Sequence, residues 1–255
     1  VGNGSAVVEV TRGTLRVMIQ AEDFFHFSQM KGIENDDEAT RQRRFLRKAK
    51  LMNGAIINFC PYLEAESEDG EVVFAGSRQD AMQLQRNRHF FGRNADVKEG
   101  TRAAASILST GPDYVIAEAL GVETSIGAAA LSAYEYIDNV ADKFHVGEGI
   151  PVVIEDLNVD AENGTVSLRM NRAILERRAN PAMNIHSLAR GGAYGATVTS
   201  VNERFYRLIV DVGNIQARVA LTSSDELLTR GDRVTLLVYG YDDKRNYVWG
   251  ACHKV

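Results

Sequence analysis

The chain has 255 residues, of which 45% are hydrophobic and 25% charged, a composition typical of globular proteins that bury real cores. A formal net charge of −5 excludes proteins that coat nucleic acid through bulk charge, so any such binding needs a local basic patch. No apolar run approaches the roughly 20 residues that span a bilayer, and no signal peptide is visible.

Strand signals dominate the chain from its first residues to its last. Each signal is a short apolar or alternating run with turn residues on either side. Such runs predict small antiparallel barrels rather than one parallel sheet. In chain order the runs are VVEV, RVMI, AIINF, EVVFA, TRAAASIL, YVIAEA, TVSLRM, GATVTSV, YRLIVDV, QARVAL, RVTLLVYG and YVWGA.

Two basic helices are predicted among the first strands. Residues 38–52 (EATRQRRFLRKAKLM) bring Phe45, Leu46, Ala49 and Met52 to roughly one face. Residues 77–93 (SRQDAMQLQRNRHFFGR) place Ala81, Met82 and Leu84 inward and Arg78 outward. The basic side chains proposed to contact phosphate are Arg41, Arg43, Arg44, Arg47, Lys48 and Lys50 of the first helix, and Arg86 and Arg88 of the second.

The first basic helix has a second interpretation. Acidic stretches lie around it at residues 34–38 and 64–71. A solvated basic face that balances these acids would have no nucleic-acid role. A phosphate-binding face would instead concentrate positive potential in an acidic protein and lose affinity steeply with salt.

One pattern of glycine, apolar strand, acidic or Asn-rich turn and closing strand occurs three times. The copies begin LMNGAIINFCPYLE, FHVGEGIPVVIED and LTRGDRVTLLVYG, turn through SEDG, DAENG and YDDKRN, and close with EVVFAGS, TVSLRM and YVWGA. Repetition at domain-sized spacing predicts three similar modules. We call them module one (residues 1–93), module two (94–178) and module three (179–255).

An earlier strand pair precedes this unit in two of the modules. It reads RAAASILSTGPDYVIAEAL in module two and YGATVTSVNERFYRLIVDV in module three. Module one has too few residues before RVMIQ for the same first strand. Either its barrel is incomplete or its first strand lies in sequence upstream of Val1.

The strand order, with a helical or irregular link between the third and fourth strands, is that of the five-stranded OB barrel. The modules resemble the S1-type RNA-binding repeat, and the whole chain is similar to multi-repeat S1-like proteins of bacterial mobile elements and phages. The fold class predicted is therefore mainly β, with three tandem OB barrels, the first incomplete and decorated by two basic helices. The residues that carry the resemblance are Gly195, Val198 and Val201, Gly121 and Gly213, and the pairs Gly147-Glu148 and Gly231-Asp232.

The resemblance implies a surface that stacks the bases of single-stranded RNA, or of single-stranded DNA. Aromatic side chains fall at or next to the family's stacking positions, and Asp160 and Asp242 or Asp243 match its hairpin acid. The candidates are Tyr114 in module two, and Phe205 and Tyr206 with Arg207 in module three. Two family positions are changed in all modules: the His falls on Gln20, Gly127 and Ala220, and the Arg on Glu71, Thr165 and Tyr247.

The last hairpin adds an aromatic cluster. Tyr239 and Tyr241 share one face of a strand, and Tyr247 and Trp249 share one face of the next. One pair is expected to fill the barrel, while the other forms a stacking platform or a protein interface. Tyr247 and Trp249 complete the set of predicted nucleic-acid-binding residues.

No catalytic, metal-binding or cofactor-binding constellation is present in the sequence. The five histidines are scattered without ligand spacing, and no phosphate-binding GxxxxGK[ST] loop occurs. Cys60 and Cys252 lack CxxC partners, which predicts buried thiols in a reducing cytoplasm. The sequence therefore predicts a protein that is not an enzyme and needs no cofactor.

Two functions follow. The first is a non-enzymatic protein that holds single-stranded RNA with tandem barrels, in the cytoplasm of a bacterium or an infected host and away from membranes. The second is a scaffold protein of a phage or mobile-element assembly, located in a virion or the host cytoplasm. In that case the barrels contact other proteins, as the changed His and Arg positions favour.

Overall fold

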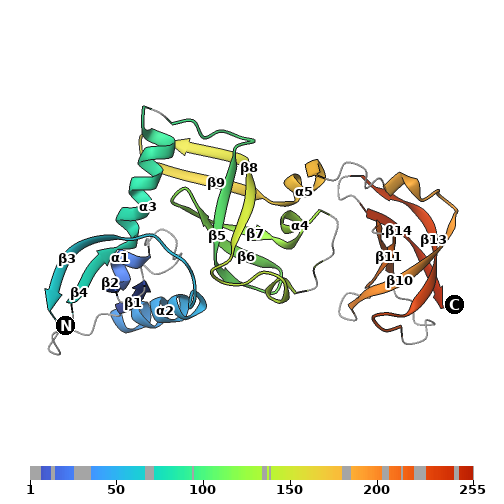
Figure 1. Cartoon of the computed structure of the whole chain (residues 1–255), viewed down its shortest axis with the longest axis horizontal. Helices are drawn as coiled ribbons and strands as arrows, with labels where there is room; N and C mark the ends of the chain where they lie inside the picture. The colour runs from blue at the N-terminus through green and yellow to red at the C-terminus, as the bar shows by residue number, and fades with distance from the viewer. Residues whose placement is uncertain are drawn as a thin grey trace.

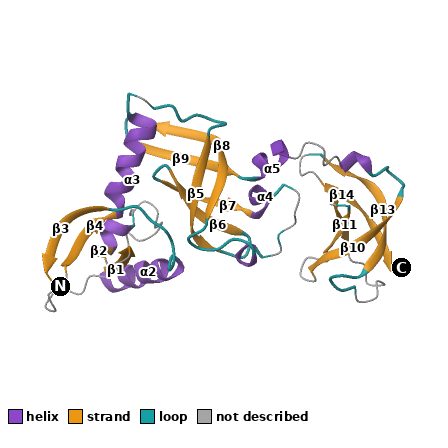
Figure 2. Cartoon of the chain, in the orientation of Figure 1, coloured by secondary structure: helices purple, strands orange, loops and turns teal. Residues whose placement is uncertain are grey.

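The structure is a computed structural model, and its sheets follow one another along the chain (Figures 1 and 2). It describes residues 7–12, 15–25, 36–66, 72–93, 95–133, 137, 139–179, 185–202, 207–213, 215–220, 228–243 and 247–254. Three sheets form within these residues, one in each predicted module. No helix in this part of the chain is long and apolar enough to cross a membrane.

Module three forms a closed barrel, which lies beside the C-terminus marked in Figure 1. Its strands are β10 (Ala193–Asn202), β11 (Arg207–Val212), β12 (Ile215–Ala220), β13 (Arg233–Asp242) and β14 (Tyr247–Lys254). They follow one another around the barrel as β10-β11-β12-β14-β13, and β13 pairs again with β10. Every pair is antiparallel except β12 with β14. This arrangement confirms the predicted OB barrel.

Module two repeats the topology without complete closure. Its strands are β5 (Arg102–Thr110), β6 (Tyr114–Ala119), β7 (Val122–Gly127), β8 (Gly149–Asp160) and β9 (Thr165–Asn171), in the order β7-β6-β5-β8-β9. The two edge strands β7 and β9 are joined where the hydroxyl of Thr124 donates to the carbonyl of Leu168 at 3.0 Å. The barrel is therefore nearly closed.

Module one contains four strands of the same barrel. These are β1 (Val7–Arg12), β2 (Leu15–Gln20), β3 (Cys60–Glu66) and β4 (Val72–Ser77), in the order β1-β2-β4-β3. The pair β2 and β4 is parallel, as are β12 and β14 in module three. The four strands therefore correspond to strands two, three, four and five of the barrel. Among the described residues of module one, no strand takes the place of the first strand, so the four-stranded sheet is open between β1 and β3.

Two backbone features recur at the fourth strand of every module. A glycine with positive φ precedes this strand at Gly54, Gly147 and Gly231. A β-bulge then interrupts the pairing with the fifth strand, and the bulged positions are Tyr62, Glu155 and Tyr239. Because both features recur at the same place, Gly54, Gly147 and Gly231 are structurally equivalent, and so are the three bulged residues.

Short helices link and cover the strands. They are α1 (Ala21–Phe24), α2 (Glu38–Leu51), α3 (Arg78–Arg86), α4 (Ala128–Leu131), α5 (Ala173–Ala179), the π-helix η2 (Asn87–Phe91), and the 3-10 helices η3 (Val140–Asp142) and η4 (Ile185–Ser187). Helix α2 begins after Asp37, whose carboxylate accepts from the amide of Thr40 at 2.7 Å. Ser77 caps α3 in the same way, accepting from the amide of Asp80 at 3.0 Å. Both predicted helices therefore form, the second continuing as η2.

Each sheet has its own apolar core, but the core of module one reaches into module two. Its buried side chains include Phe25 and Phe45, whose rings stack 5.8 Å apart. Leu108 of β5 belongs to the same cluster, and Ile116 of β6 packs against it. Because module one lacks a strand, it completes its core partly with the outer surface of module two.

Candidate nucleic-acid interface

The outer side of β6 and β7 in module two is covered by module one. Val115 and Ala117 point into the barrel core, so alternation turns Ile116 and Glu118 outward. Glu118 and Glu123 of β7 pair there with Arg78, the first residue of α3. Strands two and three form the surface with which OB barrels bind oligonucleotides. In module two this surface is occupied by module one.

Arg78 is fully buried, so its predicted outward position was wrong. Its guanidinium donates to the carbonyl of Phe24 at 3.1 Å and to the Glu123 carboxylate at 3.3 Å, and it also bonds Glu118. A buried guanidinium needs such partners. The two carboxylates come from residues about 40 positions away in the chain. Leu84, predicted to point inward, is instead exposed.

Two of the predicted phosphate-binding residues also lie at this junction. The Lys48 ammonium is 3.5 Å from the Glu123 carboxylate and 4.6 Å from the Phe25 ring centre. Burial lowers the pKa of Lys48, while Glu123 acts in the opposite direction. Arg86 donates to the carbonyl of Gly121 at 2.8 Å, and burial lowers its pKa as well. Both cations hold module one against module two.

The remaining cations of α2 lie on its solvent side. Arg43, Arg47 and Lys50 are exposed and spaced at i, i+4 and i+7, which places them on one face opposite Phe45. We call these three residues the basic face of α2. Arg44 forms an ion pair with Asp36 at 2.9 Å, and Arg41 donates to the carbonyl of Asp36 at 3.2 Å.

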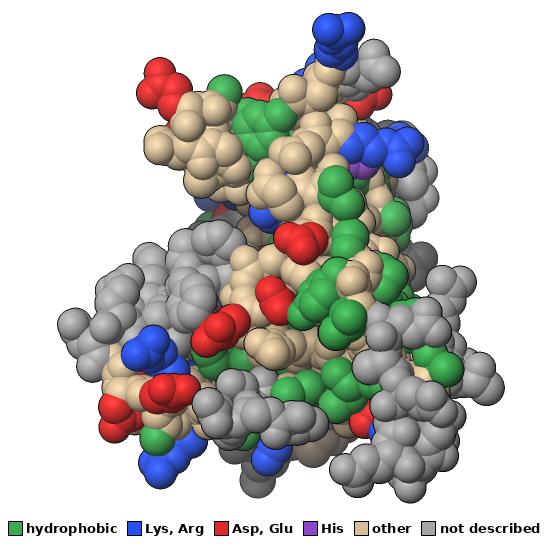
Figure 3. Space-filling view, turned by 90° about the vertical axis from the view of Figure 1, so that its left-hand side faces the viewer, with side chains coloured by type: hydrophobic (Ala, Val, Ile, Leu, Met, Phe, Trp, Pro, Cys, Tyr) green, Lys and Arg blue, Asp and Glu red, His purple; other side chains and the backbone are tan. Residues whose placement is uncertain are grey.

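Figure 3 shows the side of module one that carries β3 and β4. On this side Lys and Arg side chains lie interspersed with Asp and Glu side chains. Hydrophobic and uncharged side chains lie between them, so the part of this side that the structure describes shows no patch of a single charge sign.

Module three carries an exposed aromatic surface on β12, β13 and β14. The side chains of Tyr239 and Trp249 are 42% and 44% exposed, and their rings meet edge to face with centres 5.9 Å apart. Arg218 lies beside Trp249 in the β12–β14 ladder, and its guanidinium lies 4.1 Å from the ring centre of Tyr247. We call Arg218, Tyr239, Tyr247 and Trp249 the aromatic face of module three.

The β-bulge of β13 shapes this face. It separates Tyr239, which is exposed, from Tyr241, which packs against the core and donates its hydroxyl to the carbonyl of Leu188 at 2.6 Å. Gly240 lies under the indole, and a Cβ added there would be 2.9 Å from Nε1 of Trp249. Glycine therefore allows the Trp249 ring to lie directly on the strand. The expected division of the four aromatics by strand was wrong, because the bulge splits the β13 pair.

The remaining predicted residues are not brought together. Tyr114 is 39% exposed at the start of β6, and its ring lies on Gly111. Arg207 and Arg88 are exposed in different modules. Phe205 and Tyr206 lie outside the described residues. Asp160 accepts from the amides of Glu162 and Asn163, each at 3.1 Å, so it stabilises the hairpin turn.

Arg218 was not predicted from the sequence. A signal for it exists in the run IQARVA, where an arginine stands between two inward residues, Ala217 and Val219. Its proximity to Trp249 depends on the parallel β12–β14 register, which joins segments about 30 residues apart in the chain. Alternation alone predicts only that Arg218 faces outward.

Cys252 is buried in the core of module three, as predicted, while Cys60 is only half-buried. Among the described residues, no three His, Cys, Asp or Glu side chains are grouped closely enough to hold a metal ion.

No protein-family model matches the chain, and no curated protein matches it in sequence. Among solved structures, the chain is similar to a chain in a complex of a/eIF2alpha, aDim2p and rRNA from Pyrococcus horikoshii OT3. The identity is 18% and the TM-score 0.25, over 34% of this chain and 52% of that chain, so the match spans about half of that protein.

A second match is a multidomain protein with nucleic acid binding domains from Streptococcus pneumoniae TIGR4. The identity is 10% and the TM-score 0.20, over 98% of this chain and 69% of that chain. With TM-scores below 0.5, neither match specifies the fold or function of this chain.

Proposed function

We propose that the chain is a non-enzymatic protein that binds single-stranded nucleic acid, with RNA as its ligand, through the aromatic face of module three. The observation that carries this proposal is the exposed Tyr239–Trp249 pair beside Arg218 on an OB barrel. The exposed rings of Trp249 and Tyr239 offer flat surfaces on which bases can stack. The guanidinium of Arg218 can contact a phosphate while it stays against the ring of Tyr247.

The basic face of α2 supplies a second contact in this proposal. Arg43, Arg47 and Lys50 point away from the core and present three positive charges along one side of the helix. Phosphate contacts of this kind add affinity without sequence preference. Two weak sites on one chain strengthen each other through effective concentration when one strand reaches both.

The proposal is tested by titrating the protein into fluorescein-labelled oligouridylate at low and high salt and following fluorescence anisotropy. We expect saturable binding that weakens with salt. Trp249→Ala should reduce the affinity by roughly 5- to 150-fold, because stacking on one aromatic ring contributes ~1–3 kcal/mol per base.

Tyr62→Ala is the matched control, because Tyr62 is an exposed aromatic residue at the equivalent bulge of module one. Its affinity should stay within about twofold of the parent protein. No binding at low salt, or equal losses in the two variants, would reject the proposed site. Repeating the titration with oligodeoxythymidylate distinguishes an RNA-selective site from a general single-strand site.

One observation favours the scaffold function instead. The outer surface of β6 and β7 in module two already forms a protein contact, with a buried Arg78 and two carboxylates at its centre. Aromatic residues are also enriched in protein–protein interfaces. If the aromatic face behaved like that surface, it would dock on another protein, and the titrations above would show no nucleic-acid binding.

A further inference from the structure

A cleft opens in module two where its barrel does not close. In module three the parallel β12–β14 ladder pairs Ala217 with Val248. The equivalent residues of module two are Thr124 on β7 and Leu168 on β9, but these two strands form no ladder. The bond from the Thr124 hydroxyl to the Leu168 carbonyl takes the place of backbone pairing. Beside this bond lies a cleft of about 410 Å³.

Three elements line this cleft. Helix α3 contributes Gln83 and Arg86, the start of β7 contributes residues 122–124, and the β8–β9 hairpin contributes residues 163–168. Figure 1 shows the hairpin reaching α3, so module one supplies one wall and module two supplies the others. The uncharged polar side chains on these walls are those of Gln83, Thr124, Asn163, Thr165 and Ser167.

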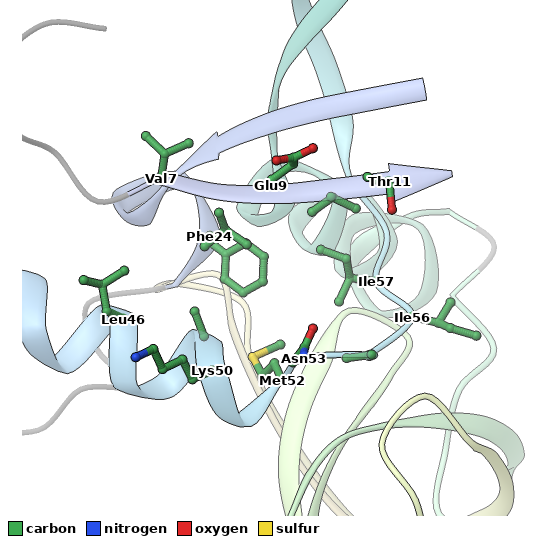
Figure 4. Close-up of a pocket in the computed structure, with 15 residues that line it drawn as sticks. Val7, Glu9, Thr11, Phe24, Leu46, Lys50, Met52, Asn53, Ile56 and Ile57 are labelled. Atoms are coloured by element: carbon green, nitrogen blue, oxygen red, sulfur yellow. The ribbon is translucent and has the colours of Figure 1, made fainter. Parts of the chain in front are cut away.

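The hollow beside β1 and α2 in module one has a different lining. Figure 4 shows mainly apolar side chains there, among them Phe24, Leu46 and Ile57. Its two charged side chains, Glu9 and Lys50, have opposite signs, so its lining does not select a ligand by charge. The cleft of module two is instead lined by hydrogen-bonding groups.

Arg86 is the cation of this cleft, and its orientation is fixed. It donates to the carbonyl of Gly121 at 2.8 Å and to the side-chain oxygen of Gln83 at 2.7 Å. The amide nitrogen of Gln83 donates in turn to the side chain of Asn87 at 2.8 Å. These bonds leave other N–H groups of the guanidinium without a partner among the described residues. Those groups can donate to a ligand in the cleft.

The charge of Arg86 is not balanced within the junction of the two modules. Glu118 pairs with Arg78, and Glu123 pairs with both Arg78 and Lys48. Within the described part of the chain, both partners of Arg86 are uncharged groups. Burial lowers the pKa of Arg86, because its charged form loses hydration there, while Glu118 acts in the opposite direction. An anion that enters the cleft would supply the missing counter-charge.

The hairpin wall offers groups that suit phosphate oxygens and the polar groups of a sugar. Thr165 and Ser167 are exposed on β9, where their hydroxyls can donate. Asn163 is held by Asp160, which accepts from its side-chain amide at 2.7 Å and from its backbone amide at 3.1 Å. Asp160 itself does not line the cleft, so its carboxylate does not face the ligand.

We propose that this cleft binds a nucleotide through its phosphate group, with the Arg86 guanidinium on the phosphate and the hydroxyls of Thr165 and Ser167 beside it. Guanidinium donors match phosphate oxygens in geometry and charge. The volume of the cleft is within the roughly 300–1,000 Å³ of pockets that hold small organic molecules. A free nucleotide and a single strand carry the same phosphate chemistry. The site is separate from the aromatic face and does not depend on it.

The test is a calorimetric titration of the 255-residue protein with uridine 5′-monophosphate at low salt. We expect saturable binding at one site per chain, and at least about tenfold weaker binding of uridine, which lacks the phosphate. Arg86→Gln should weaken binding of the nucleotide at least about tenfold, because it removes the charged donors. Arg88→Gln is the matched control, exposed outside the cleft, and should change it less than about twofold.

A second pair of variants changes the cleft without touching α3. Ser167→Glu adds a negative charge to the hairpin wall and should weaken nucleotide binding at least about tenfold. Ser167→Gln adds a side chain of similar size without the charge, and should stay within about threefold of the parent protein. Because Ser167 is exposed, this pair provides the test if Arg86→Gln lowers the melting temperature.

Titration with fluorescein-labelled oligouridylate identifies the source of the phosphate. If a single strand supplies it, Arg86→Gln lowers the affinity for oligouridylate as well as for the nucleotide. If a free nucleotide is the ligand, only nucleotide binding falls. A protein that binds the nucleotide but not oligouridylate would retain this site and contradict the proposed function.

Three results would overturn the assignment. One is the absence of nucleotide binding together with an unchanged affinity of Arg86→Gln for oligouridylate. Another is equal affinity for uridine and its monophosphate, which would exclude recognition through the phosphate. The last is an equal loss of nucleotide binding in Arg86→Gln and Arg88→Gln, which would reduce the effect to net charge.

Discussion

Modules two and three differ most clearly at equivalent positions around the fourth-strand bulge. In module two these positions hold Glu155 and Arg169, which form an exposed ion pair at 3.3 Å. In module three they hold Tyr239 and Trp249, whose rings are in contact. A second difference lies on strands two and three, where module two buries Glu118 and Glu123 against module one.

The comparison shows that backbone topology does not decide how an OB barrel uses its surface. The bulges, the glycines before strand four and the antiparallel ladders of the two barrels match, and only the closing β12–β14 ladder is specific to module three. The outward side chains on these strands differ in chemistry. Module two uses charged residues to attach module one on one side. Module three has an aromatic surface beside an arginine. Function is therefore to be sought in these side chains rather than in the fold.

The largest expected effect comes from breaking the buried ion cluster. Arg78→Ala leaves Glu118 and Glu123 buried without their partner, and should lower the free energy of unfolding by about 3–5 kcal/mol. Urea denaturation followed by circular dichroism measures the change.

Arg169→Ala is the control, because it removes an exposed ion pair in module two, the barrel that also carries Glu118 and Glu123. It should lower the free energy of unfolding by less than about 1 kcal/mol. Equal effects of the two variants would mean that the contact between modules one and two is not held by Arg78.

The second effect concerns the basic face of α2. Replacing Arg43, Arg47 and Lys50 together by Glu should reduce the slope of log affinity against log salt by about 2, at ~0.7 per phosphate contact on a single strand. Anisotropy titrations over a salt series measure this slope.

A variant with Lys98, Arg102 and Arg190 changed to Glu carries the same net charge and is the control, since these side chains are exposed elsewhere. If both variants lost the same slope, net charge and not the basic face would explain the change.

Much of this architecture was predictable because its signals are local. Alternating runs, the threefold glycine–strand–turn pattern and the short sequence before β2 predicted three barrels and the incomplete first one. The spacing of apolar side chains in residues 38–52 and 77–93 predicted both helices. These features depend on neighbouring residues, so a single sequence contains them.

The parts that were not predictable depend on contacts between distant segments. Helical periodicity placed Arg78 outward, but its partners Glu118 and Glu123 lie in another module. Lys48 was proposed as a phosphate contact and instead faces Glu123 for the same reason. Arg218 joins the aromatic face only through the β12–β14 register. No local pattern encodes these juxtapositions.

A smaller effect is expected from transferring the aromatic pair. Glu155→Tyr, Asp156→Gly and Arg169→Trp together give module two the residues of module three at the same bulge, including the glycine on which the indole lies. If this pair is sufficient to stack a base, affinity for oligouridylate should rise by about tenfold, within the ~1–3 kcal/mol of one stacked base. An unchanged affinity would show that Arg218 and Tyr247 are also required.

The smallest effect is a dependence of stability on acid pH. Asp232 accepts from the amide of Thr229 at 2.8 Å, and this hydrogen bond lowers the pKa of its carboxyl below the ordinary 3.8. The bond contributes fully above the unfolded-state pKa and is lost as pH falls through the lower folded-state pKa.

Asp232→Asn removes this titrating carboxyl. The melting temperature of the variant should therefore fall less between neutral and acid pH than that of the parent protein. Thr229→Ala removes the hydroxyl, which also lowers the pKa of Asp232, but keeps the amide donor, whose effect is larger; it should therefore change the curve less than Asp232→Asn does. A parent-like curve for Asp232→Asn would contradict the role of this turn.

Trp249 is the single tryptophan of the chain, so its fluorescence reports on the aromatic face alone. Titration with unlabelled oligouridylate is predicted to quench this emission, with the same midpoint as the anisotropy curve, because bases stack on the indole. Binding detected by anisotropy while the Trp249 emission stays constant would contradict the assignment of the aromatic face as the nucleic-acid site.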